Sequence, residues 1–214
     1  MSLKIFKPYT KSTRGTVSIN RKNLWKGKAL KTLTFGKNST GGRNNLGRIT
    51  SRSRGAGNKN KYRMIDFYRK KDDLKAKVER IEYDPNRSAH VALVKYEDEV
   101  YNYILAPSKI KIGDQIVSGR NKEIKIGNCM PLSDIPEGTN IHNIELVPNS
   151  GGKLVRSAGS SAQISGIDEN YCIIKLVSGE IRKIISTARA TIGSVSNSDH
   201  QNIKIGKAGR NRWK

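Results

Sequence analysis

A 28-residue segment, Gly36 to Arg63, limits what this chain can fold into. It contains eight Lys or Arg, six Gly and no acidic residue, and its few apolar side chains follow neither a helical nor a strand period. Such a segment cannot bury enough apolar surface to offset the entropy that is lost when its backbone becomes ordered. We therefore expect it to become ordered against a polyanion, and nucleic acid is the polyanion that suits so many clustered cations.

The charge of the whole chain is divided into blocks. The chain has 214 residues and a formal net charge of +23. Residues 1–70 carry 19 Lys or Arg and one acid, Asp66, and residues 201–214 carry five Lys or Arg and no acid. The blocks 71–132 and 133–200 are close to neutral. Two basic arms around two nearly neutral domains are typical of an RNA-binding protein, because an enzyme with a basic surface would spread its charge more evenly. These four blocks are the predicted domains.

Short strand patterns fill both neutral blocks. The runs Val91–Tyr96 and Tyr101–Leu105 are rich in β-branched and aromatic residues and flank the acidic turn Glu97–Glu99, which predicts a hairpin. About five such strands within 71–132 predict a small closed barrel. A second series of short strands predicts another β domain over 133–200. A single sandwich that contains both series is the alternative architecture.

The residue types that enzymes use are scattered along the sequence. His90, His142 and His200 are isolated, and we expect each of them at the surface or facing RNA. The Gly-Lys pairs lack the spacing of a phosphate-binding P-loop. Cys129 and Cys172 lie far apart without a CxxC motif, so we interpret them as two buried thiols and expect no metal site. We predict a protein that is not an enzyme and has no cofactor; a metal-dependent nuclease is the enzymatic alternative.

The chain shows no sign of membrane association. No apolar run approaches the roughly 20 residues of a membrane span. Its basic start lacks the apolar core of a secretory signal, and we interpret it as part of the mature arm.

The predicted RNA contacts lie mainly in the basic segment and in the C-terminal tail. Glycines in both regions allow the backbone to approach RNA closely, and the Trp of the tail can stack on a base or a sugar. The contacts expected from this chemistry are Arg43, Asn44, Asn45, Arg48, Arg52, Arg54, Lys59, Lys61, Arg63, Lys207, Arg210, Arg212 and Trp213.

A series of short motifs carries a family resemblance. They are, in order, GGRNN at 41–45, GRIT at 47–50, ERIEYDPNRSA at 79–89, YILAP at 103–107, RSAG at 156–159 and GKAG at 206–209. In this order, and over the chain from about Lys26 onward, they resemble the large-subunit ribosomal protein L2 family. The resemblance implies an OB-fold barrel followed by an SH3-like barrel, with extended basic N-terminal and C-terminal arms.

The same resemblance implies partners and a function. It implies a structural constituent of the large ribosomal subunit that binds large-subunit rRNA, lies among other ribosomal proteins, and supports rRNA folding near the peptidyl-transferase region and subunit association in translation. It further implies that Arg87, in YDPNRSA, and Arg156, in LVRSAG, contact RNA. Each is followed by small residues that let a phosphate approach, and a guanidinium can hold a phosphate through two hydrogen bonds. A free-standing OB-fold RNA-binding factor is the alternative function.

One departure from the family pattern concerns the C-terminal region. Bacterial members continue past the GKAG motif into a Gly- and His-rich loop, and the His that is discussed there in connection with peptide transfer has no match in this chain, His200 included. A separate polypeptide that supplies this part, its loss, and an incomplete sequence are the three explanations. Because split or trimmed genes and an Asn-, Lys- and Ile-rich composition are typical of AT-rich organelle genomes, we expect a mitochondrial ribosome, with bacterial cytoplasm or plastid as alternatives.

Overall fold

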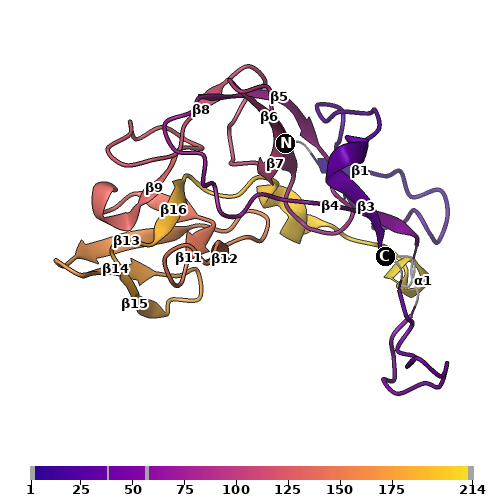
Figure 1. Ribbon diagram of the computed structural model, residues 1–214. Helices are drawn as coiled ribbons and strands as arrows, with labels where there is room; N and C mark the ends of the chain where they lie inside the picture. Colours follow the sequence, from indigo (N-terminus) through magenta and orange to yellow (C-terminus); the bar gives the residue numbers. More distant parts are fainter. Residues whose placement is uncertain (1–2, 38, 56–57, 212–214) are drawn as a thin grey trace.

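A four-stranded sheet and a six-stranded sheet form the body of the molecule, and basic segments extend from it (Figure 1). The computed structural model describes residues 3–37, 39–55 and 58–211. The fold is mainly β with curled sheets, so the predicted OB-type barrel followed by an SH3-like barrel is confirmed. Each barrel has its own cluster of buried side chains, and the alternative of a single sandwich is therefore wrong.

The first barrel is built on antiparallel strands in the order β7-β6-β5-β8. The predicted hairpin around the acidic turn is present, with Val91 opposite Leu105 and Lys95 opposite Tyr101. These strands are rich in β-branched and aromatic residues, whose side chains pack well on a pleated sheet with one face on a core. That core consists of Ala76, Val78, Ala92, Val94, Tyr96, Ile104, Ala106, Ile110 and Ile116. The strands are β5 (Ala76–Glu82), β6 (Val91–Tyr96), β7 (Tyr101–Leu105) and β8 (Gln115–Ile116).

The second barrel contains the strand order β15-β14-β13-β10-β16-β9 and the separate pair β11-β12. Its core is formed mainly by Ile and Ala side chains from these strands. The sheet begins at Cys129, because β9 pairs with β16, whereas the predicted boundary lies between 132 and 133. The elements are β9 (Cys129–Pro131), the 3-10 turn η2 (Leu132–Asp134), β10 (Asn140–His142), β11 (Ile144–Glu145), β12 (Gly152–Leu154), β13 (Ala162–Ile167), β14 (Tyr171–Lys175), β15 (Ile181–Ile185) and β16 (Arg189–Ile192).

Two arginines tie the segment that leads into the first barrel to its surroundings. The buried side chain of Arg69 donates from Nε to Ser118 Oγ at 3.1 Å and from Nη2 to the Gly127 carbonyl at 3.4 Å. Arg189, on β16, donates to both carboxylate oxygens of Asp72 at 2.6 and 2.7 Å and to the Arg69 carbonyl at 3.1 Å. A bidentate pair of this kind adds directional constraint as well as energy. Residues 69–72 are therefore tied to both barrels.

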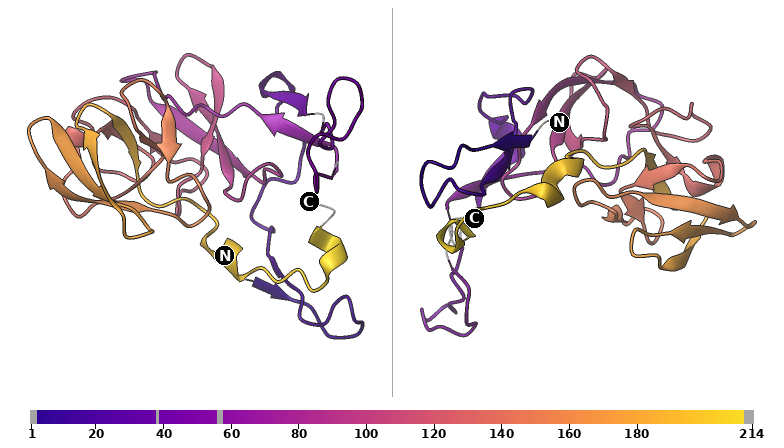
Figure 2. Two further views of the ribbon diagram at one scale, coloured as in Figure 1. Left: turned by 90° about the horizontal axis from the view of Figure 1, so that it is seen from below. Right: turned by 180° about the vertical axis from the view of Figure 1, so that it is seen from behind.

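The N-terminal arm and the C-terminal tail pair with each other. The strands β1 (Leu3–Ile5) and β2 (Val17–Ile19) form a hairpin in the arm. Val17 and Lys204 exchange two backbone hydrogen bonds of 3.0 Å, so the tail runs beside this hairpin (Figure 2). The tail contains the 3-10 helix η3 (Ser198–Asn202) and the short helix α1 (Ala208–Asn211).

The basic segment forms a hairpin that projects from the body (Figure 1). Its ends are β3 (Thr34–Lys37), which follows the 3-10 turn η1 (Lys31–Leu33), and β4 (Asn60–Arg63). Between these strands, Asn44 Oδ1 accepts hydrogen bonds from the backbone N–H groups of Leu46 and Arg48, both at 3.0 Å. The sequence pattern predicts no strand here, so this pairing and the turn built by Asn44 are findings of the structure.

Two further observations concern the whole chain. Cys129 and Cys172 are free and buried, as predicted, and burial raises the pKa of both thiols. Within the described ranges no helix is long and apolar enough to span a membrane.

Candidate nucleic-acid interface

The turn between β5 and β6 fixes the direction of Arg87. The fully buried carboxylate of Asp84 accepts hydrogen bonds from the Asn86 N–H at 2.9 Å and from Arg87 Nε at 2.6 Å. The Asn86 side chain donates to the Lys61 carbonyl at 2.7 Å, which ties the turn to β4. Among the described residues no hydrogen bond engages the two Nη atoms of Arg87. The Asp84 contact therefore orients the guanidinium of Arg87 and leaves its two Nη atoms available to bind an anion.

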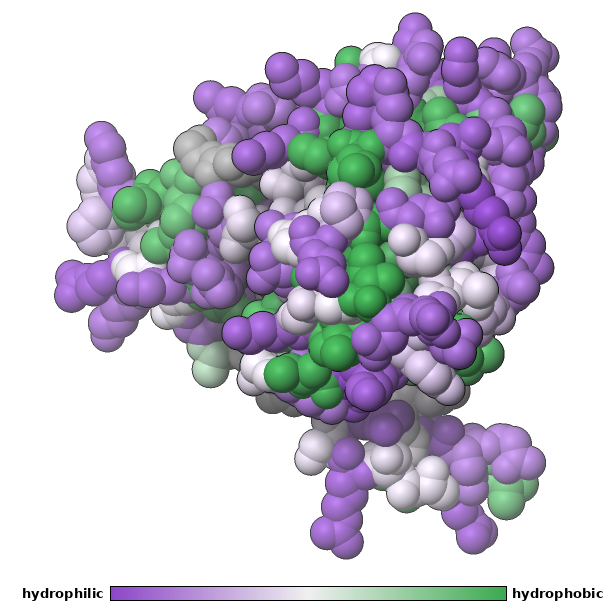
Figure 3. All heavy atoms as spheres, turned by 90° about the vertical axis from the view of Figure 1, so that its left-hand side faces the viewer, coloured by the Kyte–Doolittle hydropathy of each residue, from purple (hydrophilic) through white to green (hydrophobic). Residues whose placement is uncertain are grey.

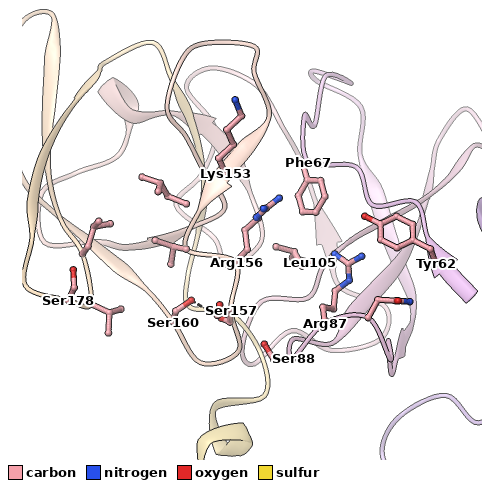
Figure 4. Close-up of a pocket in the computed structure, with 15 residues that line it drawn as sticks. Tyr62, Phe67, Arg87, Ser88, Leu105, Lys153, Arg156, Ser157, Ser160 and Ser178 are labelled. Atoms are coloured by element: carbon pink, nitrogen blue, oxygen red, sulfur yellow. Dashed lines mark hydrogen bonds between the residues drawn. The ribbon is translucent and has the colours of Figure 1, made fainter. Parts of the chain in front are cut away.

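Arg156 reaches the same place from the second barrel. Its guanidinium carbon lies 4.7 Å from the ring centroid of Phe67, and that of Arg87 lies 6.0 Å from the same centroid. Arg87 is also 5.6 Å from the ring of Tyr62. Figure 4 shows both guanidinium groups turned toward Phe67 from opposite barrels. The fold thus brings together two residues that are 69 positions apart in the sequence.

The groove that contains these two arginines has a volume of about 650 Å³. It combines cations, hydroxyl groups and aromatic surface, and no acidic residue lines it among those the structure describes. This is the chemistry that holds a phosphate and the sugar beside it: guanidinium and ammonium groups neutralise the anion, and hydroxyls donate to its oxygens. Its polar lining residues are Tyr62, Asn86, Arg87, Ser88, Lys153, Arg156, Ser157, Ser160 and Ser178.

Ser88 connects the two walls of the groove. Its hydroxyl accepts a hydrogen bond from the Ala158 N–H at 3.1 Å, and its carbonyl accepts one from Asn197 Nδ2 at 2.6 Å. Ala158 lies two residues after Arg156, and Ser88 follows Arg87 directly. The spacing between the two arginines is therefore set by short hydrogen bonds close to each of them.

Arg63, another predicted contact, is engaged inside the protein. Its Nε pairs with the buried carboxylate of Glu82 at 3.1 Å. The same carboxylate accepts hydrogen bonds from Arg80 Nε at 2.8 Å and from the Tyr103 hydroxyl at 2.9 Å. Burial raises the pKa of Tyr103, so its hydroxyl keeps the proton that it donates. Arg63 is not among the residues that line the groove, and its contact with RNA stays a prediction.

Most of the predicted contacts in the basic segment lie on the projecting part of the hairpin. Figure 3 shows this projection as a largely hydrophilic tip below the body of the molecule. Asn44 is half-buried because its side chain builds the turn. The exposed members of the predicted set are Arg43, Asn45, Arg48, Arg52, Arg54, Lys59 and Lys61.

The predicted contacts of the C-terminal tail differ in their exposure, and two of them lie outside the described residues. Lys207 is exposed. Arg210 is half-buried and donates from Nη1 to Thr16 Oγ1 and to a backbone carbonyl, both at 2.9 Å, so it fastens the tail to the arm. Arg212 and Trp213 lie outside the described residues.

The expectation that the histidines face outward is wrong for two of them. His90 and His142 are 2% and 0% exposed, so both are buried. His142 Nδ1 donates to the Gly193 carbonyl at 2.8 Å, which the sequence gives no sign of. Burial lowers the pKa of both imidazoles to about 4, and the nearby cation of Arg21 adds to the effect on His90. Both are buried, neutral residues.

Most residues that line the groove are missing from the predicted set, and Phe67 and Lys153 are two of them. Phe67 stands in no motif, and its role depends on the arginines that the fold places around it. Lys153 lies three positions before Arg156, in GGKLVRSAG, and this nearness to a basic motif is the signal that could have identified it.

Comparisons with known proteins give matches along the whole chain. Residues 30–118 match the family model "Ribosomal Proteins L2, RNA binding N-terminal domain", and residues 125–214 match "Ribosomal Proteins L2, C-terminal domain". The chain is 62% identical over 214 residues to "Large ribosomal subunit protein uL2" of Pelagibacter ubique, covering 100% of this chain and 76% of the relative. It is 60% identical to uL2 of Granulibacter bethesdensis and 57% identical to uL2 of Rickettsia prowazekii, each over 213 residues, covering 100% of this chain and 77% and 78% of those relatives.

Proposed function

This chain belongs to the large-subunit ribosomal protein uL2 family, and we propose that it holds large-subunit rRNA in the groove between its barrels. As a family member it is a structural constituent of the large ribosomal subunit with an RNA-binding domain. The match extends along the whole chain, which does not favour a free-standing RNA-binding factor.

The observation that carries the proposal is the convergence of Arg87 and Arg156 on Phe67. The two guanidinium groups come from different barrels, and the residues beside them are joined by the Ser88–Ala158 hydrogen bond. Because Arg87 is already oriented by Asp84, it loses little side-chain freedom when it binds a phosphate. A single RNA segment in the groove would therefore contact both barrels.

The basic hairpin and the tail supply a second kind of contact. Their cations would neutralise packed phosphates and place the chain on the RNA, while carrying little sequence information. Specificity would come from the fit between the fixed groove and one folded rRNA surface. The predicted contacts on the hairpin and the tail, from Arg43 to Trp213, have this role in the proposal.

Several finer proposals concern the ribosome itself. The bound rRNA would lie near the peptidyl-transferase region and support subunit association, and the role would be structural, without catalysis. The relatives are bacterial proteins, which favours a bacterial ribosome over the mitochondrial one that the composition suggests. A second polypeptide that contributes the rest of the relatives' length stays a prediction, which mass spectrometry of the intact subunit tests.

The test is rRNA binding by two single variants and their combination. We expect Arg87→Ala and Arg156→Ala each to weaken binding by about 1–3 kcal/mol, the range of a hydrogen bond to a charged group. Because both would hold one RNA segment, the double variant should lose less than the sum of the two losses. Arg182→Ala is the matched control, since Arg182 is an exposed arginine on β15 that pairs with Glu180. Unchanged binding in both single variants would remove the groove from the interface.

A further inference from the structure

Trp25 is held by its backbone and yet exposes its side chain. Its N–H donates to the Ile81 carbonyl at 2.8 Å, and it forms a parallel bridge with Glu82 on β5. The preceding residue, Leu24, is buried. Despite these anchors, 49% of Trp25 is exposed. Large aromatic surfaces are usually buried or in contact with a partner, so this exposed indole needs an explanation.

The indole is also fixed in its orientation. The guanidinium carbon of Arg80 lies 4.9 Å from the ring centroid, and Arg80 is itself held by its 2.8 Å hydrogen bond to Glu82. Gly27 lies so close to the ring that a Cβ at this position would come within 2.5–2.8 Å of Nε1, Cε2 and Cζ2. A ring that is positioned in advance loses little conformational freedom when a partner stacks on it.

The surroundings of the ring are cationic. Trp25 lines a hollow of about 420 Å³ whose rim carries the exposed lysines 26, 28, 31 and 61. Within the described residues none of these lysines has an ion-pair partner. The acid in the lining, Glu82, is buried and already paired with Arg63 and Arg80. An apolar protein side chain could cover the indole but would leave four ammonium groups without anions.

We propose that this hollow is a second RNA site, in which an unpaired nucleobase stacks on the exposed part of Trp25. The lysines around the ring take the phosphates on either side of that base. An aromatic platform inside a cationic groove is the arrangement that binds unpaired nucleotides with little dependence on sequence. The inference rests on the proposed function, since it assumes that rRNA is the partner, but it uses none of the residues of the groove between the barrels.

The experiment uses the full chain with Trp213→Phe, so that Trp25 is the only remaining tryptophan, and large-subunit rRNA as the probe. We expect rRNA to quench the fluorescence of Trp25. Trp25→Ala should weaken binding roughly 5- to 150-fold, the range that corresponds to one stacked base. Trp25→Phe keeps a smaller ring and should lose less, which gives a reading even if the alanine variant folds poorly.

Gly27→Ala tests the position of the ring without removing it. The added methyl group forces the indole to move, so we expect weaker binding and less quenching. Gly166→Ala is the matched control, because a Cβ there meets only Ile173 atoms at 3.7 Å or more, in the other barrel.

The outcomes separate this inference from the proposed function. Unchanged Trp25 emission and unchanged affinity of the Trp25 variants, in a chain that still binds rRNA, overturn the stacking site and leave the groove standing. Quenching by another large-subunit protein but not by rRNA also overturns it, in favour of a protein contact. Failure of the unmodified chain, with both tryptophans, to bind rRNA overturns both.

Discussion

Replacing Asp84 with Asn removes one buried charge and leaves the shape of the side chain unchanged. The amide oxygen can still accept the hydrogen bond from the Asn86 N–H, which is 2.9 Å from Asp84 Oδ1. The new NH₂ group then faces Arg87 Nε, which lies 2.6 Å from the other carboxylate oxygen of Asp84. Two hydrogen-bond donors would therefore face each other in place of the ion pair. Arg63 keeps its 3.1 Å pair with Glu82 and is less affected.

The size of the effect follows from these contacts. Breaking a fully buried ion pair by removing one partner costs about 3–5 kcal/mol, and losing a hydrogen bond to a charged group costs about 1.5–3 kcal/mol. The Arg87 side chain is 15% exposed at the groove, so its charge can be partly hydrated there. We therefore expect Asp84→Asn to lower the free energy of unfolding by about 2–3 kcal/mol.

Urea unfolding followed by circular dichroism measures this change. With a typical urea dependence of about 1–3 kcal/mol per molar, the midpoint should fall by roughly 1 M. Affinity for rRNA should fall between that of the unmodified chain and that of Arg87→Ala, because the guanidinium is present but no longer oriented. Asp98→Asn, in the exposed acidic turn where Asp98 pairs with Lys71, is the control and should leave the midpoint nearly unchanged. Equal midpoints for the two variants would refute the role given to Asp84.

Two other predictions concern the cores and the basic hairpin. Burial lowers the pKa of His90 and His142 from 6.5 to about 4, so as the pH falls the unfolded chain takes up protons before the folded chain does. The contribution of each neutral histidine to the free energy of unfolding is therefore complete above pH 6.5. Between pH 6.5 and pH 5 the free energy of unfolding should fall by about 1–2 kcal/mol per histidine. Urea midpoints at both pH values measure this, and His142→Asn should flatten the slope; an unchanged slope would contradict the assignment. Gly42 has φ +75°, and a Cβ there would lie 2.3 Å from the Ser51 carbonyl oxygen. Gly42→Ala should therefore distort the basic hairpin and weaken rRNA binding. Gly36→Ala is the control, because a Cβ at Gly36 meets no atom within 4 Å and should change the hairpin backbone little. The two variants can be compared by filter binding, and equal affinities would argue against a preformed hairpin.

Local patterns predicted the parts of the fold that local chemistry determines. The strands β6 and β7 have the bounds of the two apolar runs, Val91–Tyr96 and Tyr101–Leu105, because β-branched and aromatic residues there pack on one core. The pairing of β3 with β4 has no such signal. It is supported by distant polar contacts, such as the hydrogen bond from Asn86 Nδ2 to the Lys61 carbonyl, which a reading of neighbouring residues does not detect.

The candidate site shows the same division. Family resemblance identified Arg87 and Arg156 one by one, but only the folded chain places both beside Phe67. Arg63 and Arg210 have the same charge as their neighbours in the sequence, and their engagement with Glu82 and Thr16 appears only once the acceptors are in position. The burial of His142 is not predicted from its neighbours in the sequence, because its acceptor, the Gly193 carbonyl, is 51 positions away.

The hydrogen bonds between Val17 and Lys204 impose an order of events during synthesis. The two residues are 187 positions apart, so at roughly 5–20 residues per second Val17 is synthesised about 10–40 s before its partner Lys204. Throughout this interval a nascent segment with a net charge of +18 has no tail to pair with. We therefore expect this bridge to close only after Lys204 has been synthesised and has emerged, when RNA or a protective factor can already have reached the arm.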